Sequence, residues 1–151
     1  MQKINIPLKK VRKNDLPLPT YATELASGAD LYADIDEDVL LKAGQRALIP
    51  TGVAIALPDG FEAQVRSRSG LALKNGVFTL NSPGTIDADY RGEIKIILCN
   101  AGENDFIISK GMRIAQLVIA PVVQAAWVAS DDLSDTERGT GGFGSTGVSV
   151  K

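Results

Sequence analysis

The sequence predicts an all-β domain built as a sandwich or a barrel. Short apolar segments at residues 39–41, 45–49, 53–57 and 61–65 follow one another closely, and turn signals such as Pro58-Asp59-Gly60 separate them. Short strands at such spacing are typical of β-sandwiches and barrels. No segment requires a helix of ordinary length. At 151 residues the chain fits one domain, long enough to bury about two thirds of its unfolded surface.

Further strands are predicted at residues 3–11, 93–99, 105–108 and 113–120, where apolar side chains alternate with polar ones or form a short continuous run. A basic cluster accompanies the first of these strands. We interpret it as the solvated edge of a sheet, because charges on an edge strand oppose aggregation. The cluster consists of Lys9, Lys10, Arg12 and Lys13.

The composition excludes several kinds of chemistry. Histidine is absent and Cys99 is the only cysteine, so Ser-His-Asp triads, Cys-His pairs and His/Cys zinc sites are impossible. A general base must then be a carboxylate or, less commonly, a lysine or a tyrosine. Sixteen basic and eighteen acidic residues give a net charge of −2. This balance argues against nucleic acid as a partner and favours a small substrate.

Nothing in the sequence predicts export or membrane insertion. The first ten residues are interrupted by Lys3 and Pro7 and lack the apolar run of a signal peptide. The longest uncharged apolar stretch, residues 117–123, contains Pro121 and is too short to span a bilayer. Cys99 cannot form an internal disulfide, and we expect it to be a buried free thiol. We therefore expect a soluble, unprocessed, cytoplasmic protein with no membrane partner.

Two polar side chains interrupt apolar strands. Asp30 lies between Ala29 and Leu31, just after the turn signal Ser27-Gly28. It either caps that turn or places a charge near a ligand or a metal ion. Gln116 interrupts the most core-like strand, and a buried amide without partners costs about 1–3 kcal/mol. We expect either protein groups or a ligand to satisfy it.

One short helix is predicted in the segment SGLALKNG. Ser69 is positioned to cap its start and Gly76 to end it. Arg66 and Arg68 come immediately before the helix, whose first backbone N–H groups favour anions. This arrangement predicts a phosphate-binding site, although two arginines beside a short helix are more often ordinary surface residues.

The segment NSPGTIDADYRG, residues 81–92, concentrates charge between two turn signals and predicts a hairpin. Because side chains alternate along a strand, we expect Asp87, Asp89 and Arg91 on one face. Ile86 and Tyr90 should then lie on the opposite face. The segment is either a solvated hairpin tip or part of a site.

The composition changes abruptly at Arg138, where RGTGGFGSTG begins. Glycine-rich segments cannot form a core, and fixing about ten such residues costs on the order of 10–20 kcal/mol of backbone entropy. We therefore divide the chain into a domain at residues 1–137 and a flexible arm at residues 138–151. The arm nevertheless offers a cation, an aromatic ring and hydroxyls, which suit closure over a nucleotide. These groups belong to Arg138, Phe143, Ser145 and Thr146.

Five segments together resemble the motifs of the homotrimeric deoxyuridine triphosphatases, the dUTPases. In chain order they are ASGADLYA, RSRSGLALK, NSPGTIDADYRGEI, GMRIAQLVI and RGTGGFGSTG. The resemblance implies a β jelly roll and hydrolysis of dUTP to dUMP and pyrophosphate. It also implies Mg²⁺ bound mainly by the triphosphate, and a homotrimer in which each site combines motifs from three subunits. Such an enzyme limits uracil incorporation into DNA and supplies dUMP for thymidylate synthesis.

The resemblance also implies a role for each matching residue. Asp87 would be the base that activates the attacking water, and Asp89 a structural acid tied to the neighbouring backbone or to Arg91. Tyr90 would pack against the deoxyribose and exclude a 2′-hydroxyl, and Asp30 would reach Mg²⁺ through water. Phe143 would stack on the uracil. The remaining substrate-binding residues would be Asn81 and Ile86 in the hairpin, Arg68, Ser69, Gly70 and Gln116 at the phosphates, and Arg138, Gly144, Ser145 and Thr146 in the arm.

Two positions depart from the commonest bacterial pattern. Ser67 stands where proline is frequent, and Asn75 where histidine is frequent. Neither supplies the chemistry, so the departures concern the rigidity of the loops. Two alternatives remain at this point, namely an enzyme related to the dCTP deaminases and a non-catalytic jelly-roll binding module. The complete Gly-Phe-Gly arm and the pair Asp87 and Tyr90 favour the dUTPase.

Overall fold

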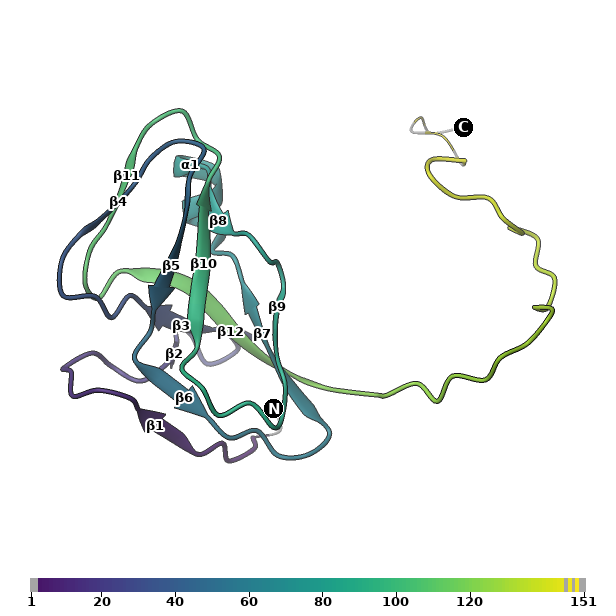
Figure 1. The fold of residues 1–151 in the computed structure, drawn as a ribbon, viewed down its shortest axis with the longest axis horizontal. Coiled ribbons are helices and arrows are strands. Elements are labelled where there is room, and N and C mark those ends of the chain that lie inside the picture. Colours follow the sequence, from purple (N-terminus) through teal and green to yellow (C-terminus); the bar gives the residue numbers. More distant parts are fainter. Residues whose placement is uncertain (1–2, 146, 148, 150–151) are drawn as a thin grey trace.

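The computed structural model describes residues 3–145, 147 and 149, and it is almost entirely β-structure (Figure 1). This confirms the predicted all-β class. The elements are β1 (Leu8–Lys10), β2 (Thr20–Tyr21), β3 (Ala29–Tyr32), β4 (Val39–Leu41), β5 (Arg46–Pro50), β6 (Val53–Ile55), β7 (Phe61–Arg66), α1 (Ser69–Asn75), β8 (Val77–Thr79), β9 (Gly84–Ile86), β10 (Lys95–Asn100), β11 (Phe106–Ile108) and β12 (Arg113–Pro121).

The strands form antiparallel sheets that enclose one apolar core. The largest sheet has the order β2-β3-β12-β7-β9, and a second sheet has the order β5-β10-β8. The remaining pairs are β1-β6 and β11-β4. Along β10 the side chains of Ile96 and Leu98 point into the core, as the alternation of a strand requires. Each such fully buried aliphatic side chain contributes roughly 1.5–3 kcal/mol.

The short helix forms where the sequence predicts it, but its start differs. Gly76 ends α1 with φ of 67°, and its N–H donates to the carbonyl oxygens of Leu71 and Ala72. The expected cap by Ser69 is wrong, because Arg68 occupies the N-cap position without a side-chain hydrogen bond. The N–H of Ala72 donates to the Arg68 carbonyl at 3.1 Å, so the helical turn already begins there.

The predicted hairpin at residues 81–92 is wrong. β9 pairs with β7, whereas the strand before it, β8, pairs with β10. The segment therefore crosses from one sheet to the other instead of folding back on itself. Figure 1 shows this crossing on one side of the domain, where β9 lies beside β7. Turn residues are compatible with both arrangements, and only the long-range pairing of β9 decides between them.

The basic cluster near the N-terminus is not simply a solvated edge. Arg12 Nε lies 2.6 Å from Oδ2 of the buried Asp34, and Asn14 Nδ2 donates to the same oxygen at 2.8 Å. This hydrogen bond raises the pKa of Arg12. Lys10 Nζ donates to the carbonyl oxygen of Leu16 at 2.6 Å. The bonds to Asp34 fasten the N-terminal segment to the domain, and the strand predicted at residues 3–11 is limited to β1.

The outer side of the second sheet carries an apolar surface between the exposed side chains of Arg46 and Lys95, and we call it the β5–β10–β8 face. Leu48 is 58% exposed and pairs with Ile97, whereas Phe78 pairs with Cys99. Leu80 is exposed and donates its N–H to the Ile97 carbonyl at 2.8 Å. Cys99 is half-buried on this face, so the expectation of a buried thiol is wrong. Odd and even positions of β10 point to opposite sides of the sheet, and Cys99 belongs to the outer set.

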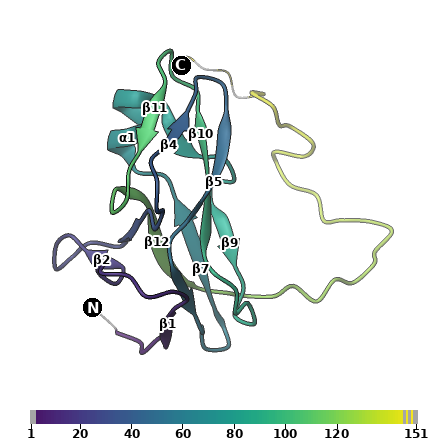
Figure 2. The same ribbon diagram turned by 60° about the vertical axis from the view of Figure 1, so that its left-hand side comes forward.

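The chain leaves the domain after β12. Residues 122–140 are exposed throughout, and both views show the segment extending away from the body (Figure 2). Val123 and Trp127 are each more than 90% exposed, which is unusual for apolar side chains so close together. In the described part of the chain, no helix has the length and apolar character needed to cross a membrane.

Candidate active site

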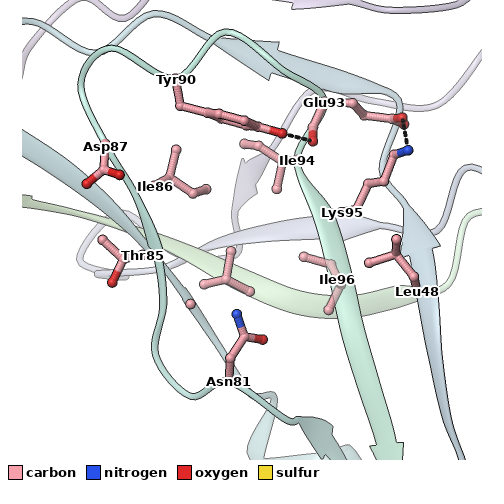
Figure 3. A pocket seen from close by; sticks show the side chains of 12 residues that line it. Leu48, Asn81, Thr85, Ile86, Asp87, Tyr90, Glu93, Ile94, Lys95 and Ile96 are labelled. Carbon is pink, nitrogen blue, oxygen red and sulfur yellow. Dashed lines mark hydrogen bonds and ion pairs between the residues drawn. The ribbon is translucent and has the colours of Figure 1, made fainter.

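A cavity of about 420 Å³ opens beside β9 and the start of β10 (Figure 3). Apolar side chains form its floor, with Ile86 from β9 facing Ile94 and Ile96. The polar side chains stand at its rim. They belong to Asn81, Thr85, Asp87, Tyr90, Glu93 and Lys95.

A turn brings Asp87 and Tyr90 to the same cavity. β9 ends at Ile86, and the N–H of Tyr90 donates to the Asp87 carbonyl at 3.1 Å. The expected alternation beyond Ile86 is therefore wrong, because the chain is no longer extended there. Asp87 and Tyr90 both line the cavity (Figure 3).

Two glycines make room for the cavity's polar side chains. A Cβ at Gly84 would lie 3.0 Å from Asn81 Nδ2, and one at Gly92 would collide with the Tyr90 hydroxyl. That hydroxyl donates to the Glu93 carbonyl at 3.0 Å, which fixes the ring across the end of the cavity (Figure 3). Sequence reasoning treated both glycines only as turn signals.

Arg91 stiffens the turn from outside. Its Nη1 donates to the carbonyl oxygens of Ala88 and Tyr90 at 2.6 and 2.9 Å. Among the bonds of the described residues, Arg91 donates to backbone carbonyl oxygens and not to the Asp89 carboxylate, so the expected tie between these two residues is wrong. A structural role for Asp89 stays a prediction.

A second cluster surrounds Asp30 on the largest sheet. Asp30 is buried in β3, and its carboxylate lies 3.2 Å from Arg68 Nε and 3.1 Å from Arg113 Nη1. Gln116 is its partner in β12 and donates through Nε2 to Asp30 Oδ1 at 3.3 Å. Asp30 is therefore no turn cap. Its partners come from two other segments, Arg68 from the start of α1 and both Arg113 and Gln116 from β12, and sequence reasoning identified all of them but Arg113.

Small residues shape this cluster as well. A Cβ at Gly28 would lie 3.1 Å from the Cβ of Gln116, so glycine leaves space for the amide side chain. A Cβ at Gly70 would meet no described atom within 4 Å, so the backbone of α1 is open to approach there. Ser67, in place of a frequent proline, bonds Thr79 through its hydroxyl at 2.9 Å and accepts the Thr79 N–H at 3.0 Å. These bonds tie the loop to β8.

The structure keeps three groups of predicted site residues apart. Asn81, Ile86, Asp87 and Tyr90 line the cavity, whereas Arg68, Gln116 and Asp30 form the second cluster and do not contribute to its lining. Ser69 and Gly70 open the adjoining helix α1.

The arm residues form the third group. Arg138 bonds only within the arm, through Nε to the Gly141 carbonyl at 2.7 Å, among the bonds of the described residues. Phe143, Gly144 and Ser145 are exposed, and Thr146 lies outside the described residues. A single subunit therefore does not assemble the predicted site.

Comparison with known proteins identifies the family. A family model described as dUTPase matches residues 14–147. The chain belongs to the dUTPase family. It is 58% identical over 143 residues to the deoxyuridine 5′-triphosphate nucleotidohydrolase of Rickettsia felis, which covers 95% of this chain and 97% of the relative. The corresponding protein of Ehrlichia canis is 58% identical over 147 residues, or 96% of each chain.

Solved structures of the family show the same fold. The dUTPase of Staphylococcus bacteriophage 80alpha, solved with dUpNHpp, superposes with a TM-score of 0.85 at 28% identity. The superposition covers 95% of this chain and 99% of the phage protein. The jelly-roll fold implied by the sequence resemblance is thereby confirmed.

The described residues contain no group of three or more His, Cys, Asp or Glu side chains that could hold a metal ion. Asp30 is the acid implied for Mg²⁺, but two guanidinium groups already contact its carboxylate. Mg²⁺ usually keeps several waters and binds through substrate phosphates with one or two carboxylates. The donor set therefore fits an outer contact to a Mg²⁺–triphosphate complex, and it does not fit a dedicated protein metal site.

Proposed function

We propose that this protein hydrolyses dUTP to dUMP and pyrophosphate, and so limits uracil incorporation into DNA and supplies dUMP. The observation that carries the proposal is the pairing of Asp87 with Tyr90 at one cavity in a chain of the dUTPase family. The phage relative solved with dUpNHpp supports a nucleotide with three phosphates as the ligand.

Asp87 is proposed as the general base. Its side chain lines the open cavity, where water reaches it, and the chain contains no histidine to take this role. A carboxylate that accepts the proton of an aligned water raises the rate of attack on the α-phosphorus. The attack forms a bond from the water oxygen to that phosphorus and breaks its bond to the bridging oxygen, so pyrophosphate leaves.

The rest of the cavity would recognise the base and the sugar. The Tyr90 ring is held at the rim by its bond to the Glu93 carbonyl, so a 2′-hydroxyl added to the sugar would meet a fixed ring. Asn81 and the neighbouring backbone would hydrogen-bond the uracil, and Ile86 would provide an apolar contact. A wrong base would leave these polar groups unpaired, which discriminates more strongly than a missing apolar contact.

The second cluster and the arm would hold the phosphates. Arg68 and Gln116 present charged and amide donors, and Ser69 and Gly70 present the open backbone of α1. In the arm, Phe143 would stack on the uracil for about 1–3 kcal/mol. Arg138 would bind the γ-phosphate, because charge-assisted bonds are needed to offset the entropy of ordering the arm. Gly144, Ser145 and Thr146 would complete the phosphate contacts.

Mg²⁺ would enter with the triphosphate, with Asp30 contacting its waters. When bound, the ion neutralises part of the charge that develops on the phosphates. The protein itself would orient the phosphates through Arg68 and Gln116.

We further propose a homotrimer whose sites are shared between subunits. The β5–β10–β8 face is an apolar sheet surface suited to burial against another copy. Leu48 belongs both to this face and to the cavity lining, so a subunit packed on the face would border the cavity. Assembly would then bring the phosphate-binding residues of another subunit to Asp87, because within one subunit these residues lie apart from it.

The decisive experiment is a hydrolysis panel of dUTP, dTTP, UTP and dCTP, with and without Mg²⁺. Release of pyrophosphate from dUTP alone is expected. Loss of the cytosine amine from dCTP without dUTP hydrolysis would instead support the deaminase-related alternative. Binding without turnover of any nucleotide would support the non-catalytic module. We also propose a cytoplasmic location, which rests on the lone free cysteine and on a substrate of the nucleotide pool.

A further inference from the structure

We propose that Arg113 is a positioning residue that keeps the charge of Arg68 available to the triphosphate. The inference rests on the proposed function, because it assigns a role within the phosphate-binding cluster. Arg113 lies at the start of β12 and reaches back across the sheet to Asp30 in β3.

Each carboxylate oxygen of Asp30 contacts a different guanidinium group. Arg68 Nε lies 3.2 Å from Oδ1, and Arg113 Nη1 lies 3.1 Å from Oδ2. The Asp30 side chain is only 3% exposed. A buried carboxylate needs such compensation, since water cannot solvate it. Arg113 therefore balances part of the negative charge of Asp30, which Arg68 would otherwise balance alone.

Arg113 also holds Arg68 through its backbone. Arg68 Nη1 donates to the carbonyl oxygen of Arg113 at 3.1 Å. The planar Arg68 guanidinium is thus fastened at Nε and at Nη1, which fixes the direction of its remaining N–H groups. No bond to Nη2 is present among the described residues, so that donor pair is free for a ligand.

The charge of the cluster follows from its members. Two guanidinium groups and one carboxylate leave one net positive charge, and removal of Arg113 would reduce the net charge to zero. The attraction of the cluster for a polyanion should fall accordingly. A nucleoside monophosphate, which does not extend to the β- and γ-phosphates, should be affected much less.

The test compares binding of dUpNHpp and dUMP by calorimetry in four proteins: wild type, Arg113→Gln, Arg113→Lys and the double variant Asp30→Asn/Arg113→Gln. Arg113→Gln should weaken dUpNHpp binding about tenfold while dUMP binding stays within twofold. Arg113→Lys should recover part of the loss, because it restores the charge. The double variant should also recover part of it without Mg²⁺, because its net charge returns to one positive. Melting curves establish that each variant is folded.

Lys110→Gln is the matched control, because it removes one positive charge three positions before Arg113 in the chain. Among the described ion pairs, Lys110 contacts only the exposed Asp15, at 3.8 Å. It should leave both affinities unchanged. Equal losses of dUpNHpp and dUMP binding in Arg113→Gln would overturn the inference and indicate a structural role, as would wild-type dUpNHpp binding. Failure of the wild-type protein to hydrolyse dUTP would overturn the proposed function separately, because that assay does not involve Arg113 variants.

Discussion

The backbone N–H of Tyr90 donates to the carbonyl oxygen of Asp87 at 3.1 Å. This single bond closes the turn that follows β9 and brings both side chains to the same cavity. Only two residues, Ala88 and Asp89, lie between the proposed base and the proposed sugar-reading ring. In the proposed mechanism, this turn would couple the position of the attacking water to the identity of the sugar.

The first prediction concerns the base. Asp87→Asn should reduce kcat by about 10²–10⁴-fold, because the amide keeps the size of the side chain and cannot accept the proton. Binding of dUpNHpp should remain within a few-fold of wild type. Steady-state pyrophosphate release and calorimetry measure the two quantities. Asp89→Asn is the control for the neighbouring acid and should reduce kcat much less. A wild-type kcat in Asp87→Asn would rule out Asp87 as the base.

Tyr90 should control the choice between deoxyribose and ribose. Tyr90→Ala should reduce the ratio of kcat/KM for dUTP over UTP by at least about tenfold, because the wall against a 2′-hydroxyl is removed. Tyr90→Phe keeps the ring and loses only the bond to the Glu93 carbonyl, a cost of roughly 0.5–1.5 kcal/mol. It should keep most of the discrimination. Equal ratios in Tyr90→Ala and wild type would contradict the role.

The arm should be needed for turnover but not for folding. Truncation after Glu137 removes residues that make no core contact wherever the structure describes them, so the melting temperature should change little. Hydrolysis of dUTP should fall by at least about tenfold, because stacking and phosphate contacts are lost. Phe143→Ala in the full chain isolates the stacking contribution and should give a smaller loss. An unchanged rate after truncation would exclude a role in closure.

The β5–β10–β8 face should be the contact between subunits. Ile97→Asp places a charge in the middle of this face, so we expect light scattering to show monomers. These monomers should no longer hydrolyse dUTP in an activity assay. Ile107→Asp is a matched control, since Ile107 is an exposed apolar residue of β11 outside the face. It should keep the assembly and the activity. An intact trimer in Ile97→Asp would place the interface elsewhere.

Arg12 should stabilise the domain without affecting catalysis. Arg12→Ala leaves the buried Asp34 with the neutral Asn14 as its remaining partner. The free energy of unfolding should fall by about 1–3 kcal/mol. Since the pKa of Arg12 is raised, the contribution is present throughout the neutral range and would be lost only as pH rises through the folded-state pKa. Urea unfolding at pH 7 measures the loss, and Lys9→Ala, an exposed neighbour, should be neutral.

The sequence by itself determined the class of the fold and most members of the site. Strand length, alternation and turn residues are local properties, so most strands from residue 39 onward, apart from β8 and β9, and the end of α1 at Gly76 were predictable to within a few residues. The motifs around Asp30, Asp87 and Gln116 were also recognisable, because their residue types and order are written in the chain.

Only the tertiary structure decided how these residues meet. The pairing of β9 with β7 replaced a predicted hairpin by a crossing between sheets, and a turn brought Tyr90 beside Asp87. The ion pairs of Asp30 with Arg68 and Arg113 join segments far apart in sequence. Such contacts depend on strand register across the sheet, and local propensity does not encode register. The sequence thus determines which charged and polar groups are present, and the packing of the sheets determines which of them form ion pairs.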